Sequence, residues 1–212
     1  MQIILADIQA PMAAAWRTFC GDLADVSVHH GSIFDCACDA VVSPANSFGF
    51  MDGGIDMLYS RFFGWQVQQR LQAQIQAAHH GELVVGAAAI VPTDHQRIPF
   101  LIAAPTMRVP MILRDSVNPY LACRAALLLI KHGYFSAGPH VGQPIASQIR
   151  AVAFPGLGTG VGRVSPATCA HQMRTAISEV LHSPPPFPVS WSEAQERHQR
   201  LYDDTVRDLQ RE

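Results

Sequence analysis

The sequence predicts one α/β domain with a small extension, in which a largely parallel β-sheet lies between helices. Three observations lead to this prediction. Short apolar runs alternate along the chain with longer segments of helical periodicity. Several of these runs are continuously apolar, as in strands that are covered on both faces. The chain has 212 residues, 49% of them apolar and 15% charged, which excludes a disordered chain and is enough to bury a core without disulfides.

The expected strands and helices follow one another in alternation. Strands are predicted from short apolar runs at residues 3–5, 26–28, 39–43, 87–91, 100–104 and 151–154. Helices are predicted from apolar residues at helical spacing at residues 11–20, 55–80, 120–131 and 166–181. Pro11 and Pro166 stand at first helical positions, and Ser165 is the expected N-cap of the last of these helices. Gly64 is expected to kink or divide the long helix around it.

The alternating pattern covers residues 1–182, and two different segments follow it. Residues 183–190 are rich in proline, which predicts a stiff linker. Residues 191–212 are highly charged with few apolar positions, which predicts a terminal helix. Whether this helix packs on its own domain or on a partner stays open at this stage.

The charge balance limits the classes of ligand. Lys plus Arg is 15 and Asp plus Glu is 17, so the net charge is −2, which argues against general nucleic-acid binding. A small phosphorylated ligand is still compatible with this charge, because backbone N–H groups can hold it. No apolar run approaches the roughly 20 residues of a membrane span, and the start of the chain lacks a basic segment typical of a signal peptide. No membrane association is expected.

The cysteines indicate a reducing compartment. There are five, scattered along a chain that is not small, so reduced thiols and a cytoplasmic location are expected. Cys36 and Cys38 are too close in sequence for a common zinc site, and no second pair follows. Neither a metal nor a cofactor is expected.

Two glycine-rich segments stand at strand-to-helix junctions, at residues 48–56 and 155–162. Ligands of open α/β sheets bind beyond the carboxyl ends of strands, where glycines let the backbone approach a ligand. One such segment is compatible with a simple tight turn, but two at equivalent junctions favour a ligand site that clamps a diphosphate. A P-loop is excluded because the second segment has no lysine, and the dinucleotide-binding fingerprint is not matched either.

Together with the strand before the first glycine segment, these residues resemble the macrodomain, an ADP-ribose-binding fold. The matching pieces occur in the family's order and lie at residues 30–33, 40–47, 53–56 and 154–162. The resemblance covers roughly residues 1–182. It implies a three-layer α/β/α fold with a central mixed, largely parallel sheet.

The resemblance also implies roles for individual residues. Asn46 would bond the distal ribose hydroxyls, and Asp56 would lie near the reacting sugar carbon, so these two are the candidate catalytic residues. The remaining expected contacts are Ser32 and Ile33 at the adenine, Gly53, Gly54 and Ile55 at the distal ribose and its phosphate, and Gly158, Thr159, Gly160, Val161 and Gly162 at the diphosphate.

Two residues depart from the family's pattern. Ser32 stands where the family often has an Asp that accepts a hydrogen bond from the adenine amino group. Ser60 stands where some hydrolytic members have a His. The resemblance therefore implies either an enzyme that cleaves a bond at the distal ribose (by de-ADP-ribosylation or by processing of ADP-ribose-1″-phosphate) or a non-catalytic ADP-ribose reader or interaction module. Its partners would be ADP-ribose or a related nucleotide and an ADP-ribosylated protein.

Several other side chains are candidate ligand contacts. Arg108 could pair with a phosphate or be an ordinary surface residue. Phe48, Phe50 and Phe63 could stack on a base, but packing in the core is the favoured prediction.

Overall fold

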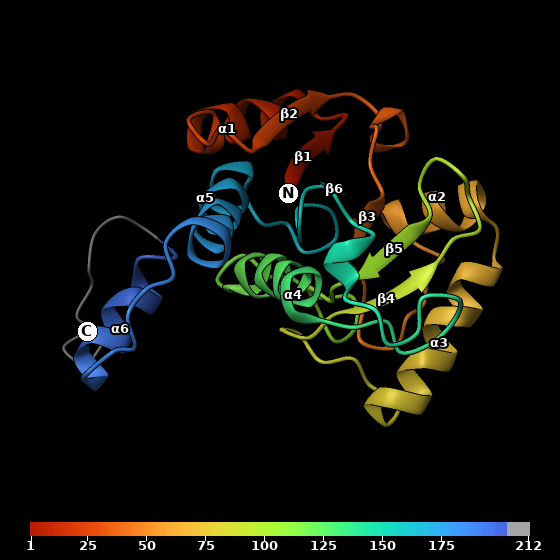
Figure 1. Ribbon diagram of the computed structural model, residues 1–212. Helices are drawn as coiled ribbons and strands as arrows, with labels where there is room; N and C mark the ends of the chain where they lie inside the picture. Colours follow the sequence, from red (N-terminus) through yellow and green to blue (C-terminus); the bar gives the residue numbers. More distant parts are fainter. Residues whose placement is uncertain (203–212) are drawn as a thin grey trace.

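A six-stranded sheet in the order β2-β1-β6-β3-β5-β4 forms the centre of the molecule (Figure 1), in a computed structural model that describes residues 1–202. The strands are β1 (Gln2–Asp7), β2 (Val26–His30), β3 (Ala40–Ser43), β4 (Ala89–Pro92), β5 (Phe100–Ala103) and β6 (Ala151–Phe154). All neighbouring strands are parallel except β4 and β5, which are antiparallel. The predicted mixed, largely parallel sheet is confirmed.

Six α-helices connect or follow these strands, and they are α1 (Ala10–Cys20), α2 (Gly54–Phe63), α3 (Gln66–His79), α4 (Asn118–His132), α5 (Pro166–Ile177) and α6 (Trp191–Gln199). Short helical turns, η1 (Ile33–Asp35), η2 (Ile145–Ser147) and η3 (Ser178–His182), add to them. Gly64 divides the long helix predicted around it, because its φ of 95° lies in a region that a helix cannot use.

The continuously apolar strands are covered on both faces. On one face, Val42 of β3 belongs to a buried cluster with Trp16 of α1, Leu127 of α4 and Met173 of α5. On the other face, its neighbour Val41 belongs to a second cluster, with side chains from α2 and α3. Successive strand residues point to opposite faces, so each apolar run contributes to both clusters. The arrangement confirms the predicted three layers.

The last strand, β6, lies between β1 and β3 in the middle of the sheet. Asp39, just before β3, fixes its start: one oxygen of the Asp39 carboxylate accepts the N–H groups of Arg150 at 2.7 Å and Ala151 at 2.9 Å. The N–H of Asp39 in turn donates to the Ala151 carbonyl at 2.9 Å. Segments more than a hundred residues apart in sequence thus enter the sheet side by side.

The segment after α5 folds back onto the domain, and α6 lies outside α5 (Figure 1). A His171 ring nitrogen of α5 lies 2.6 Å from the Arg200 carbonyl, and Leu201 is buried. The described part of the predicted terminal helix therefore packs on its own domain. Helix α6 ends at Gln199 and is followed by a turn, and the rest of that predicted helix, residues 203–212, lies outside the described residues.

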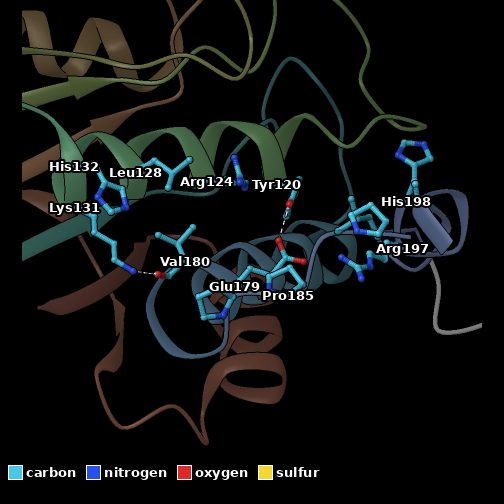
Figure 2. A pocket seen from close by; sticks show the side chains of 14 residues that line it. Tyr120, Arg124, Leu128, Lys131, His132, Glu179, Val180, Pro185, Arg197 and His198 are labelled. Carbon is cyan, nitrogen blue, oxygen red and sulfur yellow. Dashed lines mark hydrogen bonds between the residues drawn. The ribbon is translucent and has the colours of Figure 1, made fainter. Parts of the chain in front are cut away.

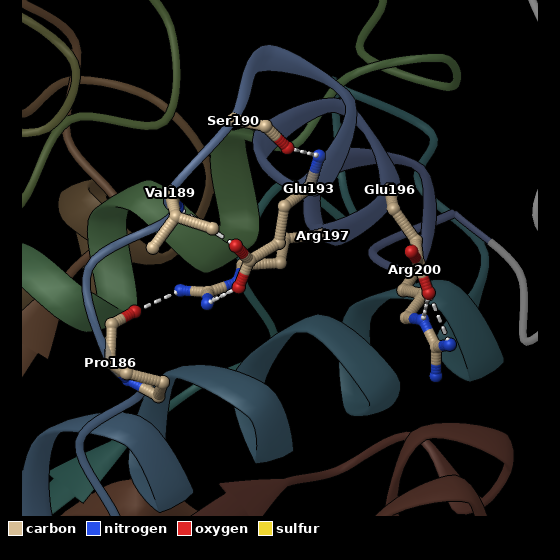
Figure 3. A network of polar contacts seen from close by, with 7 residues as sticks. All are labelled: Pro186, Val189, Ser190, Glu193, Glu196, Arg197 and Arg200. Carbon is tan, nitrogen blue, oxygen red and sulfur yellow. Dashed lines mark hydrogen bonds and ion pairs between the residues drawn. The ribbon is translucent and has the colours of Figure 1, made fainter.

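A polar network joins the proline-rich linker to α6 (Figure 3). Ser190 caps α6 by accepting the N–H of Glu193 at 3.2 Å, and the Glu193 carboxylate accepts the N–H of Val189 at 2.8 Å. Arg197 pairs with Glu193 and also donates to the Pro186 carbonyl. These contacts hold the linker and the helix together as one unit.

The five cysteines are all free and buried. Cys20, Cys123 and Cys169 lie in the layer of α1, α4 and α5, whereas Cys36 and Cys38 lie in the layer of α2 and α3. Burial raises the pKa of Cys20 to about 12 and that of Cys36 to about 11, so these thiols stay protonated.

Within residues 1–202, no helix combines the length and apolar character that crossing a bilayer requires. The same residues contain no group of three or more His, Cys, Asp or Glu side chains arranged to hold a metal ion.

The packing of β6 generates a test of the core. Phe154 is completely buried, whereas Phe187 in the linker is 89% exposed. We expect Phe154→Ala to lower the free energy of unfolding by about 3 to 5 kcal/mol, because it removes a ring from a filled core. The matched control Phe187→Ala is expected to change it by less than about 0.5 kcal/mol. Urea unfolding followed by tryptophan fluorescence measures both, and equal effects would contradict the packing described above.

Candidate functional site

A cleft of about 680 Å³ opens beyond the carboxyl ends of the parallel strands. Its walls come from the segments that follow β1, β2, β3, β5 and β6, so it collects residues from nearly the whole length of the chain. Every site residue predicted from the sequence lines this cleft: Ser32, Ile33, Asn46, Gly53, Gly54, Ile55, Asp56, Gly158, Thr159, Gly160, Val161 and Gly162. The two glycine segments therefore share one cavity, as expected of a clamp.

Asn46 shapes the first glycine segment with its side chain. The amide nitrogen donates to the Phe50 carbonyl at 2.8 Å, and the amide oxygen accepts the N–H groups of Phe48 at 3.1 Å and Phe50 at 3.3 Å. These bonds use both acceptor sites of the oxygen and one of the two hydrogens on the nitrogen. Only one N–H of Asn46 stays available for a ligand, so its main contribution here is to hold the loop.

The first segment is also fixed from below by α2 and α3. Gln68 accepts the N–H of Met51 at 2.7 Å, and Ser60 donates to the Met51 carbonyl at 2.8 Å. Ser60 is completely buried and thus acts as a structural anchor for the loop. Gly49 has a φ of +68° and packs against Leu71, where a larger residue would be strained and crowded.

The start of α2 presents unpaired backbone donors to the cleft. Gly53 is its N-cap and provides no side-chain cap. Within residues 1–202, the N–H groups of Gly54 and Ile55 have no acceptor. A Cβ added to Gly53 or Gly54 would meet nothing within 4 Å, so both residues border open space. These donors and the positive end of α2 favour an anion at this point.

The glycines of the second segment have two different tasks. Gly158 and Gly162 close the loop: a Cβ on Gly162 would lie 2.5 Å from the Gly158 carbonyl oxygen, and Gly158 itself has a φ of +69°. Gly160, by contrast, faces open space, with nothing within 4 Å of an added Cβ. In the described part of the chain, the N–H groups of Thr159, Gly160 and Val161 have no acceptor. The loop therefore offers consecutive donors to the cleft.

The N-terminus of α5, which lies closest to this loop, carries a side-chain cap. Ser165 caps the helix as expected, accepting the N–H of Thr168 at 3.1 Å. The free donors of the second segment thus come from the loop backbone, whereas those of the first come from a helix N-terminus.

Asp56 lies in the first turn of α2 at the floor of the cleft and is 8% exposed. Its carboxylate accepts a hydrogen bond of 2.6 Å from the Ser43 hydroxyl of β3. Burial raises the pKa of Asp56 to about 7, although the Ser43 bond works in the opposite direction. The group can therefore gain or lose a proton near neutral pH.

At the other end of the cleft, Ser32 and Ile33 follow β2. The Ser32 hydroxyl oxygen accepts the N–H of Phe34 at 3.3 Å, and Ile33 is 5% exposed. Apolar side chains from the start of α1, including Met12, complete this end. In the sheet, β1 and β6 lie between β2 and β3, so this part of the cleft lies away from Asn46 and Asp56.

The structure corrects the sequence-based interpretation of one side chain, decides that of a second and adds a third. Phe50, favoured for the core, is 54% exposed and lines the cleft, because the Asn46 bonds turn its loop outward. Arg108 is the ordinary surface residue of the two alternatives: it donates two hydrogen bonds of 2.7 and 3.1 Å to Glu82 and does not line the cleft. Asp7 at the end of β1 was not predicted but lines the cleft. Its position at the carboxyl end of a parallel strand was the available signal.

A second cavity, of about 480 Å³, lies between α4, η3 and the C-terminal segment (Figure 2). Tyr120 donates to Glu179 across it at 2.7 Å, and Lys131 donates to the Val180 carbonyl at 2.6 Å. None of the residues that the sequence singled out for ligand binding line this cavity. The residues that the sequence predicts for ligand binding thus line the cleft and not this second cavity.

Comparison with known proteins places these observations in a family. The Macro domain family model matches residues 42–173. An uncharacterised protein of Aquifex aeolicus is 31% identical over 149 residues, which are 70% of this chain and 78% of that protein. Another from Aeropyrum pernix is 32% identical over 161 residues, 75% of each chain.

Solved structures with a similar fold are more distant in sequence. The macrodomain of Mycobacterium tuberculosis DarG has a TM-score of 0.55 at 18% identity, covering 70% of this chain and 87% of that one. The Oceanobacillus iheyensis macrodomain with ADP has a TM-score of 0.56 at 17% identity, covering 82% and 85%. Thermosipho africanus DarTG in complex with ADP-ribose has a TM-score of 0.55 at 15% identity, covering 72% and 38%.

The burial of Asp56 generates a stability prediction. Its pKa is raised from 3.8 to about 7, so the stabilising state is the protonated one and wild-type stability falls as the pH rises through this interval. Asp56→Asn cannot ionise and keeps the Ser43 bond. We expect the variant to gain stability relative to wild type by roughly 2 to 4 kcal/mol between pH 4 and pH 8.

Urea unfolding at both pH values measures this gain, with Asp52→Asn as the control. Asp52 is an exposed carboxylate of the same loop, so its replacement is expected to have a small effect that is similar at both pH values. A stability difference between Asp56→Asn and wild type that is independent of pH would show that the Asp56 carboxyl is not desolvated.

Proposed function

The chain belongs to the macrodomain family, and on that premise we propose that its cleft binds ADP-ribose or an ADP-ribose derivative and hydrolyses a bond at the distal ribose. The binding proposal rests on two sets of unpaired backbone N–H groups in one cleft, at residues 54–55 of the first glycine segment and 159–161 of the second. Solved structures of similar fold include complexes with ADP-ribose and with ADP, which supports this ligand class.

Neutral N–H donors suit a diphosphate in this cleft better than a cationic side chain would. Neutral N–H groups that are already in place need no side-chain ordering when the anion arrives. Arg108, the cation that the sequence offered for this purpose, is bound to Glu82. With a net charge of −2, the protein would bind the ligand through fixed dipoles, and its affinity would depend little on long-range attraction.

Asp56 would act as the general base in hydrolysis. Its carboxylate would accept a proton from a water molecule as that water attacks the anomeric carbon of the distal ribose. The bond from this carbon to the leaving group breaks through an oxocarbenium-like state, and the leaving group takes up a proton. A pKa of about 7 keeps a useful fraction of Asp56 ionised near neutral pH. Asn46 would position the ribose by holding the loop beside it.

The alternative is a non-catalytic reader of ADP-ribose, or an interaction module that carries it. One observation favours it: Ser60, at the place where a His would be expected in some hydrolytic relatives, is buried and donates to a loop carbonyl. Residue 60 of α2 therefore supplies no titratable side chain next to Asp56.

The proposal extends to partners and location. The substrate would be a free ADP-ribose derivative or an ADP-ribosylated protein, not a nucleic acid. The five free, buried cysteines support a reducing, cytoplasmic environment as part of the same proposal.

The clamp generates a binding prediction. A side chain at Gly160 would enter open space without strain, so Gly160→Val should fold normally and fill the cleft. We expect this variant to lose at least tenfold in affinity for ADP-ribose, measured by isothermal titration calorimetry, with an unchanged melting temperature. Gly53→Val, on the facing segment, should behave in the same way.

Gly162→Val is the contrasting control, because its Cβ would collide with the Gly158 carbonyl. It should lower the melting temperature as well as the affinity. Undiminished ADP-ribose binding by both Gly160→Val and Gly53→Val would eliminate the clamp.

The catalytic proposal is tested separately with Asp56→Asn. We expect this variant to bind ADP-ribose within about threefold of wild type but to release at least a hundredfold less ADP-ribose from an ADP-ribosylated protein. The wild-type rate should rise with pH and level off above a pH of about 7, where Asp56 is ionised. A wild-type protein that binds ADP-ribose tightly but releases none would establish the reader instead.

A further inference from the structure

We propose that Asp7, at the end of β1, recognises the exocyclic amino group of the adenine base. This inference rests on the proposed binding of ADP-ribose and adds the residue that selects the base. Asp7 is the last residue of a central strand and lines the cleft. It stands beside the turn that carries Ser32, since the Asp7 carbonyl accepts the N–H of Gly31 at 3.0 Å.

The two carboxylate oxygens of Asp7 have different surroundings. Oδ1 accepts the N–H of Gln9 at 2.8 Å and so holds the turn into α1. Oδ2 lies only 3.0 Å from the position that a Cβ on Gly156 would occupy, and the Thr159 hydroxyl lies 2.6 Å from the same position, so the glycine keeps open the space beside both groups. Within residues 1–202, no Lys, Arg or His lies at ion-pair distance from Asp7. Oδ2 is therefore an acceptor that still lacks a donor.

The surroundings of Asp7 fit a flat, mostly apolar group. Ile8, Pro11 and Met12 follow Asp7 in the chain, Ile33 follows the neighbouring strand β2, and all four line the same cleft. A lone carboxylate in such a wall selects ligands that present a hydrogen-bond donor at that place, because it can only accept. The amino group of adenine is such a donor, whereas hypoxanthine presents a carbonyl oxygen at the same ring position and would be repelled.

Ser32 is less suited to this task. Its hydroxyl oxygen already accepts the N–H of Phe34 at 3.3 Å, and a neutral hydroxyl accepts more weakly than a carboxylate. Asp7 thus supplies, from the neighbouring strand, the negative charge that the turn after β2 does not contain.

The Asp7→Asn variant provides a sharp test. The Gln9 N–H requires an acceptor, so the amide oxygen is expected to stay at the Oδ1 position and the NH₂ group to take the Oδ2 position. A donor then replaces an acceptor at the base. This donor cannot form a hydrogen bond with the amino group of adenine, but it can donate to the carbonyl of hypoxanthine. The preference for adenine over hypoxanthine should therefore reverse.

Isothermal titration calorimetry with ADP-ribose and with inosine diphosphate ribose measures this preference. Wild type is expected to bind ADP-ribose at least tenfold more tightly than the inosine compound, and Asp7→Asn to lower this ratio by at least tenfold. Asp35→Asn, an exposed carboxylate that does not line the cleft, should keep the wild-type ratio, and Ser32→Ala should change it by less than threefold. Asp7→Ser, which also keeps an acceptor for Gln9, replaces Asp7→Asn if that variant does not fold.

Each outcome has a distinct meaning. An unchanged ratio in Asp7→Asn overturns the inference while ADP-ribose binding stands. An equal loss of affinity for both nucleotides also overturns it, since Asp7 would then contact the sugar or only hold the turn into α1. A ratio that collapses in Ser32→Ala but not in Asp7→Asn assigns base recognition to Ser32. Failure of wild type to bind either nucleotide removes the proposed function itself, and the inference with it.

Discussion

The position of β6 between β1 and β3 is the constraint on which the cleft depends. β6 carries the second glycine segment, and β3 carries the first, so parallel pairing of these strands places both segments at one edge of the sheet. The Asp39 carboxylate fixes this pairing at the opposite edge by binding two N–H groups at the start of β6. A contact remote from the cleft therefore supports the strand pairing that brings the two walls of the clamp together.

Most of the elements could be predicted from the sequence, because apolar runs and the prolines at helix starts are local signals. The order of the strands in space and the reversal of β4 could not, since both depend on pairing between distant segments. The glycine segments identified the cleft for a similar local reason. The bonds of Asn46 and the outward position of Phe50 depend on the path of one loop, which composition does not specify. Asp7 was missed because a carboxylate after a strand is also a common turn residue.

The cleft combines neutral donors with carboxylates and few cations. The unpaired amides lie on glycine segments, where open space replaces side chains, while Asp7 ends β1 and Asp56 follows β3, two strands that lie on either side of β6. Asp7 lies beside the second glycine segment and Asp56 at the end of the first, so each carboxylate can contact a different part of an elongated ligand. Such a site discriminates through the placement of donors and acceptors more than through net charge.

The distribution of the thiols has a practical consequence. Three cysteines lie in one helical layer and two in the other, all protonated and out of reach of a reagent in the folded state. An alkylating reagent can modify a given thiol only after its own layer has opened. Mass spectrometry of the modified peptides would therefore report, from the natural sequence alone, whether the two layers separate from the sheet together or one after the other.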